Sequence, residues 1–188
     1  MKYDVILSGV GGQGVLSVSA IIASSAMEEG LHVKQSEVHG MSQRGGAVYT
    51  NLRLSDSAIY SDLIPVGGAS LILSMEPLES LRYMDYLNPQ GQLITSSNPE
   101  LNIDDYPDLD TLIAKIQTLP HAQVIDARKL ALEAGSGRAT NMVLAGAASN
   151  FLPIKPDTME NYIQKIFQRK GDKVVETNLK AFRLGKKA

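Results

Sequence analysis

The pattern of apolar and polar positions predicts that strands and helices alternate along the first two thirds of the chain. Residues 2–8 form an apolar run rich in β-branched side chains, and residues 15–23 have the composition of a buried helix. Between the two runs lie four glycines within six positions, Gly9, Gly11, Gly12 and Gly14. A strand, a glycine turn and a helix in this order are typical of the opening unit of a nucleotide-binding α/β domain.

Further strands are expected at residues 31–38, 47–54, 69–75, 92–96 and 122–127, with a short return strand at 58–61. The run 69–75 is apolar at nearly every position, which is typical of a strand buried on both faces of a parallel sheet. Helices are expected at 76–87 and 109–119, a turn at 88–91 and a long polar loop at 97–110.

From residue 127 onward the pattern is helical, with helices expected at 127–134, 141–151, 158–169 and 173–184. We therefore expect one α/β domain over residues 1–188, a Rossmann-like three-layer α/β/α sandwich with a mostly parallel sheet. In this division an α/β core, residues 1–135, is followed by a helical C-terminal segment, residues 136–188.

The amino-acid composition is typical of a soluble globular protein and argues against a nucleic-acid or membrane partner. A hydrophobic fraction of 44% and a charged fraction of 20% are ordinary for a soluble globular chain. The net charge of −2 argues against a nucleic-acid partner, because such proteins present a basic face. Since there is no apolar run of about 18 residues and no secretory signal, we expect a cytoplasmic protein with no membrane contact.

The absence of cysteine excludes several kinds of site. A chain with no Cys has no disulfide, no thiol nucleophile and no thiolate ligands for an ordinary iron–sulfur cluster. The three histidines, His32, His39 and His121, are far apart in the sequence, so we expect no metal site. There is no GxSxG elbow, no GxxxxGK[ST] loop and no GDG…NN pattern, and we predict no catalytic residue in this chain.

The first glycine loop is the leading candidate binding site. Gly9, Gly11 and Gly14 fit the dinucleotide fingerprint, and Glu37 lies about 20 residues further on, where that fingerprint places a ribose-binding acid. Glycines let a ligand approach the backbone, and the start of the following helix favours a phosphate. The alternatives are a tight turn without a ligand and an NAD site. Gln13 either donates to a ligand or caps the turn.

A second polar loop, residues 39–46, carries one arginine between glycines. Arg44, with Ser42 beside it, is able to bind a phosphate or carboxylate through two hydrogen bonds. One charge-assisted hydrogen bond contributes about 1.5–3 kcal/mol. The alternative is an exposed arginine in a surface or subunit contact. We expect His39 to orient this loop rather than to act as a base.

With both loops in view, the chain resembles the gamma-type subunits of the 2-oxoacid:ferredoxin oxidoreductase family. Residues 8–14 (SGVGGQG) and 37–46 (EVHGMSQRGG) match the two signatures of that family. The wording GMSQRGG favours the indolepyruvate branch. Weaker matches at 87–91, 140–147 and 178–185 occur in the expected order, so the resemblance covers nearly the whole chain.

The resemblance implies a non-catalytic subunit of a hetero-oligomer that converts arylpyruvates and coenzyme A to acyl-CoA, carbon dioxide and reduced ferredoxin. Thiamine diphosphate and iron–sulfur clusters are then expected on the large catalytic partner subunit, since this chain has neither cysteines nor a GDG motif. The role left to this chain is binding. We expect Arg44 and Ser42 to meet a phosphate or the partner's active-site edge, and a pocket for part of coenzyme A to be lined by Gly9, Gly11, Gly12, Gln13 and Gly14.

Three other interpretations stay open at this point. The same loops can form a subunit interface without any ligand. The chain can belong to the pyruvate or 2-oxoglutarate branch of the same family. A free-standing NAD-dependent oxidoreductase is the rival from another class, and it requires a catalytic acid or base beside the glycine loop.

Overall fold

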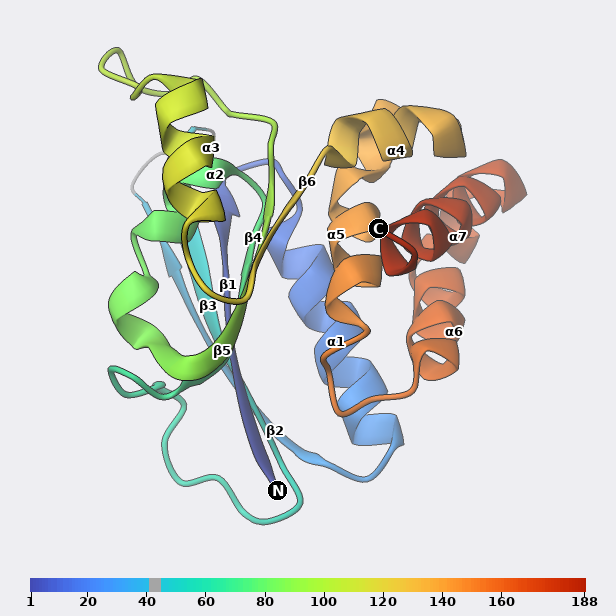
Figure 1. Ribbon diagram of the computed structural model, residues 1–188. Coiled ribbons are helices and arrows are strands. Elements are labelled where there is room, and N and C mark those ends of the chain that lie inside the picture. Colours follow the sequence, from blue (N-terminus) through green and yellow to red (C-terminus); the bar gives the residue numbers. More distant parts are fainter. Residues whose placement is uncertain (41–44) are drawn as a thin grey trace.

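A computed structural model describes residues 1–40 and 45–188, and in this part of the chain six strands form one sheet in the order β2-β3-β1-β4-β5-β6 (Figure 1). β3 is antiparallel to both of its neighbours, and the other pairings are parallel. The expected mostly parallel sheet is confirmed. The strands are β1 (Lys2–Val10), β2 (His32–His39), β3 (Ala47–Ser55), β4 (Ala69–Ser74), β5 (Leu87–Ser96) and β6 (Ala122–Ile125).

Helices cover both faces of the sheet, as the three-layer prediction requires (Figure 1). α2 (Pro77–Leu81) and α3 (Leu109–Gln117) lie on one face, and α1 (Val15–Glu28) and α5 (Thr140–Ala148) lie on the other. Outside α1 and α5 pack α4 (Ala127–Ala134), α6 (Pro156–Phe167) and α7 (Asp172–Lys186). Three short 3-10 turns complete the described elements: η1 (Met84–Tyr86), η2 (Gly137–Ala139) and η3 (Gln168–Lys170).

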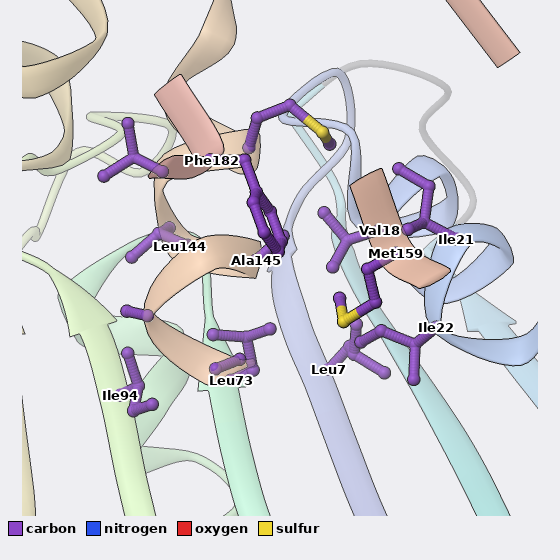
Figure 2. Packing of buried hydrophobic residues seen from close by; sticks show 14 of the residues in the cluster. Leu7, Val18, Ile21, Ile22, Leu73, Ile94, Leu144, Ala145, Met159 and Phe182 are labelled. Atoms are coloured by element: carbon purple, nitrogen blue, oxygen red, sulfur yellow. The ribbon is translucent and has the colours of Figure 1, made fainter. Parts of the chain in front are cut away.

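Two hydrophobic clusters, one on each face, hold the layers together. Along β1, Val5 and Leu7 enter the larger cluster and Ile6 enters the smaller one, because successive side chains of a strand point to opposite faces. In the larger cluster, Leu7 and Leu73 of the sheet face α1, α5 and the Phe182 ring of α7 (Figure 2). Within the described residues, no helix is both long and apolar enough to cross a membrane.

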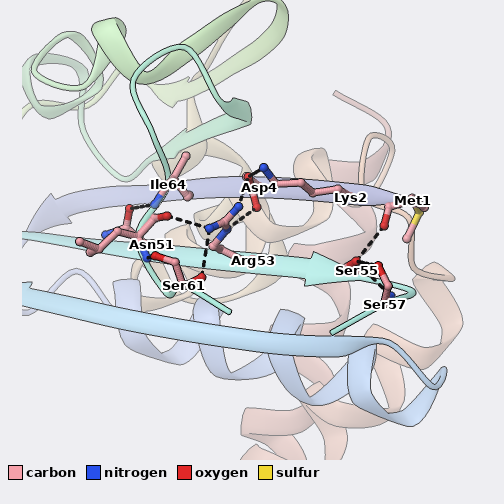
Figure 3. Close-up of polar contacts among 10 residues, drawn as sticks. Met1, Lys2, Asp4, Asn51, Arg53, Ser55, Ser57, Ser61 and Ile64 are labelled. Atoms are coloured by element: carbon pink, nitrogen blue, oxygen red, sulfur yellow. Dashed lines mark hydrogen bonds and ion pairs between the residues drawn. The ribbon is translucent and has the colours of Figure 1, made fainter. Parts of the chain in front are cut away.

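The predicted return strand at 58–61 is wrong. β3 already pairs with β1 on one side and β2 on the other, so it has no free edge for another strand. Arg53 on β3 instead holds this segment through its side chain (Figure 3). The guanidinium binds the buried Asp4 carboxylate at 2.9 and 3.2 Å, and its Nη1 donates to the carbonyls of Ser61 and Leu63 at 3.0 and 2.8 Å.

The helix expected at 76–87 begins as predicted but ends early. The chain leaves the helical path after Leu81, and the Tyr83 ring packs on Tyr49 of β3 with the ring centroids 4.8 Å apart. The turn expected at 88–91 lies inside β5. There the pairing with β4 shifts, so these residues bulge out of the register.

Helix α5 is buried from Asn141 to Ala148, which is typical of a helix that is covered on all sides. It lies between the sheet and α7, and two glycines allow the close crossing with α7. A Cβ atom on Gly146 would lie well inside contact distance of the Phe182 carbonyl oxygen. A Cβ on Gly185 would meet the Val143 carbonyl oxygen in the same way. Backbone thus packs on backbone.

We predict that Gly146→Ala lowers the free energy of unfolding by about 2–4 kcal/mol, because the helices must separate. This loss outweighs the gain of up to about 1 kcal/mol in helix propensity. Urea unfolding measures the difference. The matched control is Gly137→Ala, whose new Cβ meets only the Leu132 side chain, at 3.5 Å, and which we expect to change stability by less than about 0.5 kcal/mol. Equal effects of the two substitutions would contradict this account of the crossing.

Candidate functional site

The first glycine loop lies at the point where the strand order of the sheet reverses. After β1 the chain continues to β2 and β3 on one side, and β4 lies on the other side of β1. In sheets of this kind, ligands bind in the crevice outside the carboxyl ends of the two strands that flank the reversal. The glycine loop begins at the end of β1, and the Met75 N–H donates to the Ser8 carbonyl at 2.8 Å to join the two strand ends.

The glycines of this loop have different roles. Gly12 and Gly14 adopt φ values of 105° and 85°, in the left-handed region that favours glycine. Gly9 is buried, and a Cβ there would lie 2.9 Å from the Cβ of Met75. The Gln13 Oε1 accepts the Val10 N–H at 2.8 Å, so Gln13 caps the turn. Of its two expected roles, the structure shows this one.

The start of α1 provides free backbone donors beside the loop. Gly14 precedes the helix, whose first turn has no acidic residue and receives no side-chain cap from any residue that the structure describes. The first N–H groups of a helix have no partner within the helix, and the helix dipole adds a partial positive charge there. This arrangement favours an anion such as a phosphate.

A cleft of about 460 Å³ opens over this helix start. Gly11, Gly12 and Gly14 line it, whereas Gly9 and Gln13 do not. No described lining residue carries a carboxylate, so nothing among them repels an anion. Ser42 and Arg44 lie outside the described residues. The other lining residues are Val10, Val15, Leu16, His39, Gly40 and Val48.

The second loop is attached to the first by one backbone hydrogen bond and by the pairing of β3 with β1. The Gly11 N–H donates to the Gly46 carbonyl at 2.9 Å, whereas the Gly40 N–H, which donates to the Ala47 carbonyl at 2.9 Å, joins the two ends of the second loop to each other. The sheet register places Val10 opposite Ala47. The described ends of the second loop are therefore fixed beside the first loop, so the two signatures of the sequence meet at one edge of the sheet.

Glu37 does not occupy the position of a ribose-binding acid. The antiparallel strand β3 lies between β1 and β2, so Glu37 stands two strand positions from β1, or about 10 Å. Its carboxylate accepts a hydrogen bond from the Gln35 amide and lies 3.3 Å from the His39 Nε2. The contact with Glu37 orients His39 itself, and the expectation that His39 orients the second loop stays a prediction.

Two residues of the loop 97–108 connect the end of β4 to the second glycine loop, and the sequence alone did not indicate them. The Asn102 Nδ2 donates to the Gly45 carbonyl at 2.6 Å. The Tyr106 hydroxyl donates to Glu76 Oε2 at 2.7 Å, and Glu76 caps α2 by accepting the Glu79 N–H. The Asn- and Asp-rich composition predicted a loop over 97–110, which in the structure ends where α3 begins at Leu109, but it predicted no partner for the loop.

Burial also shapes the electrostatics around α2, near the end of β4. It raises the pKa of the Glu79 carboxyl, and the nearby Arg82, whose Nε lies 2.7 Å from Glu79 Oε1, offsets only part of that rise. Burial and the hydrogen bond to Glu76 both raise the pKa of Tyr106. The Tyr106 hydroxyl therefore stays a neutral donor near pH 7 and keeps its bond to Glu76.

Asn141 supports the first loop from beneath. Its Nδ2 lies 3.5 Å from the Gly14 carbonyl, and a Cβ on Gly14 would collide with that nitrogen. Gly14 therefore needs to be glycine for two reasons, its backbone conformation and this contact. The signal in the sequence was a single polar residue at the head of a run of small apolar ones.

The chain is similar to known proteins over nearly its whole length. The sequence profile described as "Pyruvate ferredoxin/flavodoxin oxidoreductase" matches residues 4–188. The chain is 37% identical over 195 residues to a protein named indolepyruvate oxidoreductase subunit IorB from Pyrococcus horikoshii, a match that covers 100% of this chain and 96% of the relative.

Two solved structures share the fold. The gamma subunit of a keto/oxoacid ferredoxin oxidoreductase from Geobacter sulfurreducens superposes with a TM-score of 0.71 at 24% identity, over 97% of this chain and 95% of that one. A 2-oxoglutarate:ferredoxin oxidoreductase from Magnetococcus marinus gives a TM-score of 0.78 at 24% identity, over 99% of this chain and 30% of that longer one. Because the profile matches residues 4–188 and the relative matches the full length of the chain, the chain belongs to the pyruvate ferredoxin/flavodoxin oxidoreductase family.

Proposed function

We propose that this chain is the small, non-catalytic subunit of a 2-oxoacid:ferredoxin oxidoreductase. Its complex would decarboxylate indolepyruvate and other arylpyruvates oxidatively, passing the acyl group to coenzyme A and the electrons to ferredoxin. The full-length match at 37% identity to a relative named for indolepyruvate carries this proposal. The GMSQRGG wording of residues 40–46 supports the same branch over the pyruvate and 2-oxoglutarate branches.

The division of work between subunits follows from the residues present. A chain without cysteine offers no thiolate for an ordinary iron–sulfur cluster. The sequence also lacks the GDG motif that thiamine diphosphate sites use. Both cofactors would therefore be held by the large partner subunit, where they supply the decarboxylation and the electron transfer. This chain would bind and orient coenzyme A.

Coenzyme A is the ligand that we propose for the cleft of about 460 Å³. The phosphate groups of coenzyme A match the free N–H groups at the start of α1, and the exposed backbone of Gly12 allows close approach. Ser42 and Arg44 remain our prediction for further phosphate contacts. The partner subunit would close the open side of the cleft, which makes the site composite.

Two other functions remain as outcomes of the tests below. If the loops serve only as an interface, the complex binds coenzyme A without any dependence on Gly12. The NAD-dependent alternative is weaker, because Glu37 stands two strands from β1.

We predict that the purified chain alone does not turn over indolepyruvate with coenzyme A and a ferredoxin or dye acceptor. Co-expression with the large partner subunit should give activity, with a higher kcat/KM for indolepyruvate than for pyruvate or 2-oxoglutarate. Turnover by the single chain would overturn the proposed division of work. A preference for pyruvate would overturn the substrate branch alone.

A Gly12→Ala substitution should weaken coenzyme A binding to the complex, because the methyl group projects from the loop that lines the cleft. The matched control is Gly30→Ala at the far end of α1. Both glycines have positive φ, and no described residue lies within 4 Å of a new Cβ at either, so both changes cost about 1–2 kcal/mol of stability. Calorimetric titration should show weaker binding for Gly12→Ala only. Equal affinities in the two variants would favour the interface without a ligand.

An Asn102→Ala substitution should raise the KM for coenzyme A of the complex about two- to tenfold, since one neutral hydrogen bond contributes about 0.5–1.5 kcal/mol. The substitution frees the Gly45 end of the second loop, while the chain itself should keep its midpoint of thermal unfolding. Leu101→Ala, a change of an exposed neighbour in the same loop, is the control and should leave the KM unchanged. An unchanged KM in Asn102→Ala would show that this contact does not position the site.

A further inference from the structure

A second cavity, of about 480 Å³, lies between η2, η3 and the start of α7. We call it the basic pocket and define it by the side chains of Arg138, Lys170, Lys173, Ser136 and Thr177, which line it. Of the residues that the structure describes, none lines both this cavity and the cleft over the first glycine loop. Its volume is in the range of small-molecule sites.

The charge of the chain is unevenly divided, and the basic pocket lies in the positive part. Residues 136–188 contain ten lysines and arginines but four aspartates and glutamates, although the whole chain has a net charge of −2. Asp172 and Glu176 belong to α7, yet neither lines the pocket. A concave surface with one sign of charge concentrates ligands of the opposite sign.

No described residue forms a salt bridge that neutralises the charge of the pocket cations. Arg183 pairs with Glu160 at 2.6 Å, and the Lys180 ammonium donates to the Glu133 carbonyl at 2.8 Å. Among the described residues, neither Arg138 nor the two pocket lysines form an ion pair. The Lys170 Nζ lies 5.3 Å from the centroid of the Phe167 ring, which also lines the pocket.

Polar groups of the backbone and side chains add to the charge. The Ser136 hydroxyl oxygen accepts the Arg138 N–H at 3.3 Å, which leaves its own proton available to a ligand. Among the described residues, no side chain caps the start of α7, and Asp172 is the acidic residue of its first turn. Lys173, in the first turn of this helix, thus adds its charge to the positive end of the helix dipole.

We propose that the basic pocket binds a phosphate-bearing anion. Three cations and two hydroxyls around one cavity match the several acceptor oxygens of a phosphate, which favours this ligand over a planar surface of an acidic protein. Free phosphate or pyrophosphate and the phosphates of a nucleotide share this chemistry. Asn141, which contacts the Gly14 carbonyl, also lines the basic pocket, so the two cavities are neighbours although their described linings share no residue.

The test is a titration of the full ¹⁵N-labelled chain, followed by NMR, with inorganic phosphate, pyrophosphate and ADP in separate arms at low salt. We expect amide shifts to concentrate at Gly135, Ser136, Gly171 and Lys173, and binding to weaken as salt is added. If ADP and pyrophosphate bind with equal affinity, the pocket recognises the phosphates alone. If ADP binds much more tightly than pyrophosphate, the pocket also recognises the nucleoside. Shifts confined to the first glycine loop, or no saturable shift in any arm, would overturn the proposal.

A pair of charge-matched double variants separates a built site from general attraction. Lys170→Gln with Lys173→Gln should raise the pyrophosphate Kd at least about tenfold, given the typical size of charge-assisted hydrogen bonds. Lys165→Gln with Lys187→Gln removes the same charge from the same segment outside the pocket, and should change the Kd less than about twofold. All four lysines are exposed, so both proteins should stay folded by circular dichroism. Equal losses in the two variants would refute a site in the pocket.

Discussion

The hydrogen bond from the Gly11 N–H to the Gly46 carbonyl is the contact on which the candidate site depends. It joins the loop after β1 to the segment before β3, so two glycine-rich stretches separated by more than twenty residues form one edge of the sheet. The contact requires backbone to approach backbone closely. The same requirement returns where α5 crosses α7, at Gly146 and Gly185. A backbone hydrogen bond thus fixes the position of the loops, and the two glycines allow α5 and α7 to cross closely.

Much of the fold could be predicted from the sequence because periodicity and turn residues are local signals. β4 was evident as a continuous apolar run, and α5 as a run of small apolar residues. The return strand at 58–61 could not be excluded in the same way, because the available edges of a sheet depend on all of its pairings. The buried pair of Arg53 and Asp4, which holds that segment instead, joins residues 49 positions apart.

The candidate site was predicted in part. The glycines that line the cleft stood out as a motif, since a turn beside a helix start needs residues without side chains. The contributions of Asn102 and Tyr106 come from another part of the chain and carry no local pattern, and the position of Asn141 at the head of a run of small apolar residues does not name its partner. The sequence also did not predict that β3 lies between β1 and β2. This strand order places Glu37 far from a ligand bound at the loop.

The central claim is that the glycine-loop edge of this chain is half of a site that a partner subunit completes. Hydrogen exchange, measured on the chain alone and on its complex with the large subunit with and without coenzyme A, tests it most directly. The account predicts slower exchange on assembly at residues 9–16, 45–48 and 97–108, with a further decrease at 9–16 when coenzyme A is added. Protection confined to α6 and α7, with the exchange of the loops unchanged, would contradict it.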